Sequence, residues 1–133
     1  MRKIILTALS LAIILILGGC TQPVLKGFYQ TEKDVNGYFV QISIQKDENS
    51  FIEYIDNREV DRGTYEKTES NVYKMTSDKQ NFEITLNNDN SFEIIVNKLN
   101  DGNPIKMLNI GNVPVTFPSI FDDVDEYKTL LDE

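Results

Sequence analysis

Histidine and tryptophan are absent from this sequence, and cysteine occurs once, as Cys20. Without histidine, neither a Ser-His-Asp nor a Cys-His arrangement can form, and the usual zinc ligands are missing. A single cysteine also cannot form a disulfide within the chain, although small extracytoplasmic proteins often depend on disulfides. We therefore expect a protein that is not an enzyme, has no catalytic or metal-binding residues, and is stabilised by the burial of apolar side chains.

Positive charge is scarce as well. The chain has 13 Lys and Arg residues against 21 Asp and Glu residues, which gives a formal net charge of −8. Nucleic acids and anionic lipid surfaces attract clusters of Lys and Arg. The charge balance therefore excludes nucleic acid as the main partner and argues against direct binding to anionic lipid headgroups.

The longest apolar run lies at the start of the chain. Two basic residues follow Met1, residues 4–17 are almost purely apolar, and Gly18 and Gly19 then precede Cys20. A short basic start, an apolar segment and small residues are the layout of a secretory signal peptide. The run is shorter than the ~20 residues that a permanent membrane-spanning helix needs, which favours a cleaved segment.

Residues 17–20, Leu-Gly-Gly-Cys, resemble the lipobox of bacterial lipoproteins. In that family the leucine and two small residues precede a cysteine that is diacylated and becomes the mature N-terminus. The resemblance implies a type II signal peptide over residues 1–19 and a covalent lipid on Cys20, with no other cofactor. It also implies attachment to the lipid bilayer at the outer face of the cell membrane. Richness in Lys, Asn, Ile, Asp and Glu is typical of an AT-rich, Gram-positive source.

The sequence predicts one mature domain behind a short tether. Residues 20–26 contain the lipidated Cys20 and Pro23, and we expect them to hold the domain close to the membrane. Residues 27–133 are enough for one domain with a single core.

From Gly27 onward, apolar residues recur with period two, and turn-forming residues interrupt them every ~8–12 residues. Residues 38–45 alternate cleanly, which indicates a strand with one buried and one solvated face. Gly63, inside a later strand, predicts a bulge or a close approach of two backbones. We expect an all-β fold, a small antiparallel meander barrel or half-open sandwich of about seven or eight strands. This layout resembles the small lipocalin-like and immunity-type lipoproteins of Gram-positive bacteria.

The clearest strand pair is expected late in the chain. Residues 82–86 and 92–96 both alternate, and the turn-forming residues 87–90 separate them, which predicts a β-hairpin. Glu83 and Glu93 occupy the same relative place in the two strands. Both side chains should face solvent, on the side opposite the apolar residues.

The end of the chain changes period. Ser119 follows a proline and can cap a helix, and acidic residues crowd the next turns, where the helix dipole favours negative charge. Apolar residues then recur at helical spacing, as Ile120, Val124, Tyr127 and Leu131. We therefore predict a C-terminal amphipathic helix over about residues 119–131, packed on an open end or face of the sheet.

Several segments rich in Asp and Asn offer the oxygen ligands that calcium takes, namely residues 47–49, 56–57, 87–90 and 100–103. None has the ligand spacing of an EF-hand loop, and Asp, Asn and Gly are the usual residues of tight turns. We expect plain turns at these positions and no metal site.

Residues 58–62, Arg-Glu-Val-Asp-Arg, form the densest mixed-charge stretch. Arginine forks bind carboxylates or phosphates, and tyrosine offers rigid contact area, so this stretch and the tyrosines beside it could form a recognition strip. The alternative is a solvated edge strand whose charges prevent edge-to-edge pairing. The candidate binding residues are Tyr54, Arg58, Asp61, Arg62 and Tyr65.

The leading functional hypothesis is a membrane-anchored, non-catalytic binding domain for a peptide or small amphiphile. Its negative charge would suit a protective or immunity-type role against a cationic peptide. The alternative is an accessory protein of the cell envelope that binds another protein through an edge strand or through the stretch 58–62. The aromatic residues of the strands are compatible with either a ligand cavity or a filled core.

Overall fold

The computed structural model describes residues 22–133. The predicted signal peptide and Cys20 lie outside the described residues, so the lipidation of Cys20 stays a prediction. Within residues 22–133, every helix is too short or too polar to span a bilayer.

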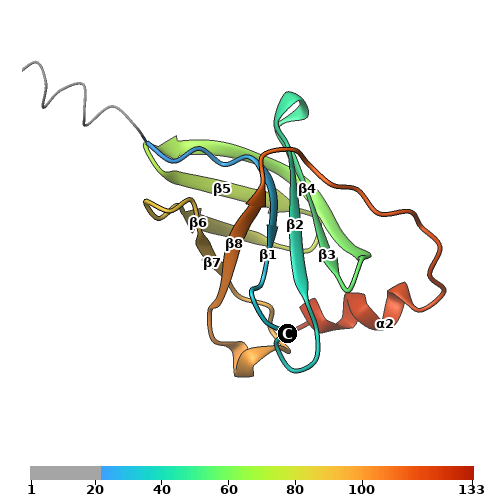
Figure 1. Cartoon of the computed structure of the whole chain (residues 1–133). Helices are drawn as coiled ribbons and strands as arrows, with labels where there is room; N and C mark the ends of the chain where they lie inside the picture. Colours follow the sequence, from blue (N-terminus) through green and yellow to red (C-terminus); the bar gives the residue numbers. More distant parts are fainter. Residues whose placement is uncertain (1–21) are drawn as a thin grey trace, which may run out of the picture.

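Strands are the main regular elements of the described chain (Figure 1). They are joined mainly by short turns, and the helices are short and lie mostly near the C-terminus. In chain order the elements are β1 (Gly27–Gln30), β2 (Val40–Gln45), η1 (Lys46–Glu48), β3 (Ser50–Ile55), β4 (Arg58–Glu69), β5 (Val72–Ser77), β6 (Asn81–Thr85), β7 (Phe92–Ile94), η2 (Asn100–Gly102), β8 (Ile105–Gly111), α2 (Val124–Lys128) and η3 (Thr129–Leu131).

The strands form one antiparallel sheet in the order β6-β5-β4-β3-β2-β1-β8-β7. Strands β1 to β6 are a meander, after which β8 pairs with the free side of β1 and β7 lies beyond β8. The sheet curls until β6 and β7 come close to each other, which gives a nearly closed barrel (Figure 1). The predicted all-β fold with a C-terminal helix is confirmed.

Local sequence features explain how β4 follows β3 and packs on β5. Asp56 and Asn57 both have positive φ, 48° and 69°, as a two-residue hairpin turn that matches the twist of the strands requires. The Asp56 side chain also accepts a hydrogen bond from the backbone N–H of Phe39 at 2.8 Å. In β4, a Cβ atom at Gly63 would collide with the carbonyl oxygen of Thr76 in β5. The predicted close approach of two backbones at Gly63 is therefore confirmed.

Strands β6 and β7 do not form the predicted hairpin. The backbone N–H of Asn87 donates to the carbonyl of Ser91 at 2.8 Å and closes the turn, but among residues 22–133 no ladder joins the two strands. Beyond β7, the backbone N–H of Lys98 donates to the carbonyl of Leu130 at 3.1 Å. The segment after β7 therefore bonds the C-terminal helices and does not continue alongside β6. The alternation predicted which side chains face inward, but it did not specify the partner strand.

The C-terminal helix is shorter than predicted, because α2 begins at Val124 and not near Ser119. The guanidinium of Arg58 stacks on the ring of Phe121 and bonds the carboxylate of Asp123. These contacts hold the preceding residues against the barrel in a non-helical course until α2 starts. The helical residues themselves pack against the core, as predicted.

Side chains fill the interior of the barrel. The rings of Tyr29 and Phe92 lie 4.6 Å apart between centroids, and both side chains are 0% exposed. Phe51 is equally buried and makes an edge contact with Phe82 at 6.1 Å. These aromatic residues therefore belong to a packed core, of the kind that a barrel of about eight strands accommodates.

Residues 112–123, named here the crossing segment, run from β8 over the outside of the barrel to α2 (Figure 1). The ring of Phe117 makes edge contacts with Phe28 of β1 and Tyr54 of β3, at 5.9 and 4.9 Å between centroids. Phe28 and Tyr54 are only 5% and 2% exposed. This part of the sheet is therefore covered on both faces.

Candidate functional site

The mixed-charge stretch 58–62 does not form one continuous surface. It begins β4, which pairs with β3 on one side and β5 on the other, so the alternative of a solvated edge strand is wrong. The register between β3 and β4 shifts at Val60, where β4 carries one extra residue. Such a bulge re-aims the neighbouring side chains. As a result Val60 and Asp61 are buried, whereas Arg62 is exposed and Glu59 is partly exposed.

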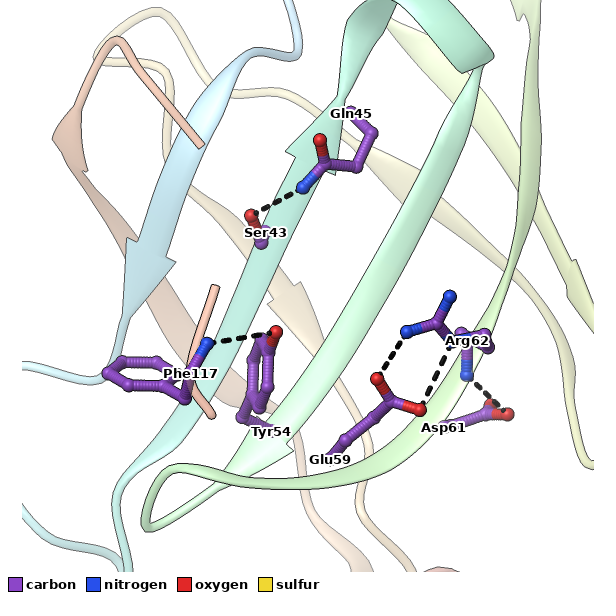
Figure 2. Close-up of polar contacts among 7 residues, drawn as sticks. All are labelled: Ser43, Gln45, Tyr54, Glu59, Asp61, Arg62 and Phe117. Carbon is purple, nitrogen blue, oxygen red and sulfur yellow. Dashed lines mark hydrogen bonds and ion pairs between the residues drawn. The ribbon is translucent and has the colours of Figure 1, made fainter. Parts of the chain in front are cut away.

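Glu59 and Arg62 pair with each other on the outside of β4 (Figure 2). The Nε group of Arg62 donates to Glu59 Oε2 at 3.1 Å, and the side chains are 65% and 39% exposed for Arg62 and Glu59. An exposed pair of this kind contributes little to stability, because solvent screens both charges. The Arg62 fork is nevertheless already engaged within the chain.

Arg58 is engaged more tightly. Its Nε and Nη2 groups donate to the two carboxylate oxygens of Asp123 at 2.9 Å each, and Nη1 donates to the carbonyl of Asp56 at 2.7 Å. Its guanidinium carbon lies 3.8 Å from the ring centroid of Phe121 and 4.5 Å from that of Tyr127. Hydrogen bonds from Arg58 lower the pKa of Asp123. Arg58 therefore fastens the crossing segment and α2 to the barrel.

The two tyrosines of the predicted strip lie apart from each other. Tyr54 is buried under the crossing segment, where its hydroxyl accepts a hydrogen bond from the backbone N–H of Phe117 at 3.4 Å (Figure 2). Tyr65 lies farther along β4, where its ring meets that of Tyr73 at 5.9 Å between centroids. The five predicted binding residues thus serve separate contacts and do not converge on one ligand site.

Asp61 belongs instead to a buried polar cluster. Gln80, in the link between β5 and β6, donates through Nε2 to Glu53 at 3.1 Å and to Asp61 at 2.8 Å, and the hydroxyl of Ser77 donates to Asp61 at 2.7 Å. Glu53 is 1% exposed, and its Oε2 atom has no hydrogen-bond partner among the described residues. Burial raises the pKa of Glu53 to about 7, and the nearby charge of Asp61 adds to the effect.

The barrel has a gap between β6 and β7, which we name the seam. Among residues 22–133, β6 pairs only with β5 and β7 only with β8, so each strand has a free edge. Free edges carry unpaired N–H and C=O groups that can pair with another strand. In Figure 1 the two strands lie next to each other on the left of the barrel.

The hydrogen bonds around β6 show which of its backbone groups face the seam. The carbonyl of Gln80 and the N–H of Leu86 both bond on the β5 side, at 2.9 and 2.8 Å. In an antiparallel ladder, alternate residues direct their backbone groups to the same neighbour. Even-numbered residues of β6 therefore bond β5. The groups that face the seam belong to Asn81, Glu83 and Thr85.

Two surface grooves follow the seam. The narrower one, of about 300 Å³, is lined by Phe82, Glu83, Glu93, Ile94, Ile95 and Pro104. The wider one, of about 540 Å³, shares Phe82 and Ile95 with it and extends to the C-terminal residues Leu131–Glu133. Ile95 is 51% exposed and contributes apolar surface to both grooves. Both volumes fall in the range of ligand pockets, about 300–1,000 Å³.

The rim of the seam is acidic. Glu83 and Glu93 are exposed and line the same groove, and neither has an ion-pair partner among residues 22–133. Lys74 and Lys106 stand opposite them in the ladders, one strand farther from the seam. Within the same part of the chain, no three acidic, His or Cys side chains gather as a metal ion would require.

Sequence reasoning missed the seam because it assigned β6 and β7 to each other. Glu83 and Glu93 were predicted to face solvent in matched positions of that hairpin, and they instead line a groove between two strand edges. Comparisons with protein-family models, curated proteins and solved structures gave no match for this chain.

Proposed function

We propose that this protein is a non-catalytic binding domain of the bacterial cell envelope, anchored to the outer face of the membrane by a lipid on Cys20. Its ligand is a peptide or small amphiphile, bound at the seam. The observation that carries the proposal is the groove along the seam, where apolar side chains lie beside strand edges that pair with no other strand of the described chain. The packed core argues against a ligand inside the barrel and supports a surface site such as the seam.

A binding role fits the polar groups better than a catalytic role does. The only acidic pair that the described residues bring together deep in the fold, Glu53 and Asp61, is 1% and 8% exposed. A general acid or base must reach its substrate within hydrogen-bond distance. At the seam, by contrast, the polar groups are exposed, and they suit recognition.

Photo-crosslinking in cells tests this proposal. A photoreactive phenylalanine analogue replaces Ile95 in the seam, and a control variant carries it at Ile120, which is 74% exposed and lies in the crossing segment. We expect the seam variant, and not the control, to capture peptides or amphiphiles of low mass. Equal labelling patterns from the two positions would contradict binding at the seam.

The free edge of β6 also favours a second candidate, an envelope accessory protein that binds another protein by strand pairing. The same crosslinking experiment separates the two. One dominant protein adduct at Ile95 would support the accessory role, whereas a series of small adducts supports the ligand-binding role.

Deleting the gene and challenging the cells with cationic peptides tests the protective version of the binding role, since unchanged susceptibility would exclude it.

A further inference from the structure

We infer that the ligand of the seam is an extended cationic peptide that adds to the free edge of β6 as an extra strand, with apolar and basic side chains in alternation. This inference rests on the proposed function and specifies the chemistry of the ligand. It follows from the backbone groups, the side chains and the charges that the seam presents.

The backbone of β6 offers the pairing groups. The N–H and C=O groups of Asn81, Glu83 and Thr85 face the seam, while the even-numbered residues of the strand are committed to β5. A peptide strand placed beside this edge would satisfy these groups with main-chain hydrogen bonds, which supply affinity in strand addition. β7 is the shorter edge, with three residues against five in β6, so β6 is the better template.

The side chains around the seam specify an alternating pattern. Residues that alternate along a strand point to opposite faces of the sheet. On the inner side, an added strand would meet the apolar groove surfaces of Phe82 and Ile94, whereas the exposed Ile95 lies on the outer side with Glu93. On the outer side it would meet Glu83 of β6, with Glu93 on the other rim of the same groove. Apolar residues therefore suit one face of the peptide, and basic residues suit the other.

The charges favour a cation and oppose self-association. Glu83 and Glu93 form no ion pair within the described chain, and the lysines opposite them in the ladders lie one strand farther from the seam. At the wide end of the seam, Asp132 and Glu133 lie beside Lys79. A second copy of this chain that paired through β6 would place acidic rims together, which is unfavourable. A basic peptide would instead gain charge-assisted hydrogen bonds to these carboxylates.

A direct binding measurement tests the inference. The full-length chain is kept in a neutral detergent, and the probe is a fluorescein-labelled eight-residue peptide of alternating lysine and valine. Fluorescence anisotropy compares it with a peptide of equal composition in which the lysines and valines form two blocks, and with an alternating peptide whose every second amide is N-methylated. We expect the block and N-methylated peptides to bind at least about fivefold more weakly, because each lacks part of the strand pairing.

Two seam variants complete the design. Thr85→Pro removes one N–H group that faces the seam while keeping the bonds to β5, and Thr85→Val is its matched control because it keeps that N–H group. We expect about fivefold weaker binding for Thr85→Pro and no change for Thr85→Val. The double variant Glu83→Gln with Glu93→Gln should bind about fivefold more weakly at low salt, and the difference should shrink at high salt.

The outcomes separate this inference from the proposed function. If the alternating and block peptides bind equally and neither N-methylation nor Thr85→Pro weakens binding, strand addition is wrong, but a peptide-binding domain still stands. If none of these peptides binds, the inference is wrong, and the proposed function then depends on whether a photoreactive group at Ile95 captures a small amphiphile; no such adduct would overturn it as well. Dimerisation that Thr85→Pro abolishes would show that a second copy occupies the edge, which also overturns the inference. The N-methylated peptide keeps the test valid even if Thr85→Pro fails to fold.

Discussion

On the outside of β1, β2 and β3 the crossing segment covers the sheet, whereas β6 and β7 leave their edges unpaired on the other side of the barrel. The covered side is held by the Phe117 ring and by the clamp from Arg58 to Asp123. The seam has neither a ladder nor a comparable clamp among the described residues. On the covered side, the outward-facing side chains of the strands pack against the crossing segment. At the seam, the outward-facing side chains stay exposed to solvent.

The largest expected effect concerns the buried cluster that holds the link between β5 and β6 beside the seam. The pKa of Glu53 rises from 4.5 to about 7 in the folded protein, so the folded state binds this proton more tightly than the unfolded chain does. Stability should therefore fall as pH rises from about 4.5 to about 7. Glu53→Gln should remove this loss, of about 3 kcal/mol, which urea unfolding at pH 5 and pH 8 can measure.

A matched control for this prediction is Glu66→Gln, because Glu66 lies exposed on β4. It should leave the pH dependence of the unfolding free energy as in the parent chain. If Glu53→Gln and the parent chain show the same pH profile, then burial of Glu53 does not govern this dependence.

The second effect tests whether the crossing segment stabilises the covered side. Phe117→Ala removes the ring between Phe28 and Tyr54, and because Phe117 is half-buried the loss should be about 2 kcal/mol, below that of a fully buried phenylalanine. Val113→Ala, in the same segment at a side chain that is 71% exposed, should change the free energy of unfolding little. Equal losses in the two variants would mean that the segment is not held by Phe117.

The third effect is smaller and concerns the clamp. Arg58→Met and Asp123→Asn should each destabilise the protein less than Phe117→Ala, and the double variant should lose less than the two losses combined, because both remove one ion pair. The folded pKa of Asp123 is lowered, so the contribution of the pair is present above the ordinary pKa of aspartate and is lost as pH falls. The free energy of unfolding of Arg58→Met should therefore decrease less than that of the parent chain as pH falls. Additive losses at neutral pH would contradict a direct pair.

Much of the fold was predictable from alternation and turn residues alone. The strand content, the turn at Asp56 and Asn57, and the close approach at Gly63 were correct, because each depends on local geometry. The hairpin was wrong because a period-two pattern shows which face is buried and not which strand lies beside it. The helix start was wrong because Arg58, distant in sequence, holds the residues before α2.

The predicted recognition strip shows the same limit of prediction from sequence. Its residues are close in sequence, yet the bulge at Val60 turns Asp61 inward and leaves Arg62 outside. Arg58 then finds its partner 65 residues later, in Asp123. A register shift and a long-range partner cannot be seen in one sequence, because both depend on which strands pair. The seam itself arises from such pairing, and the sequence pattern predicted a closed hairpin in its place.

Amide hydrogen exchange along β6 tests most directly whether the seam is open. In the free protein, the N–H groups of Asn81, Glu83 and Thr85 should exchange fast, whereas those of Phe82 and Ile84 should be protected by their bonds to β5. Adding the alternating peptide should slow the first set and leave the second unchanged. Uniform protection along β6 in the free protein would show that β6 and β7 pair as a closed hairpin, and it would contradict an open seam.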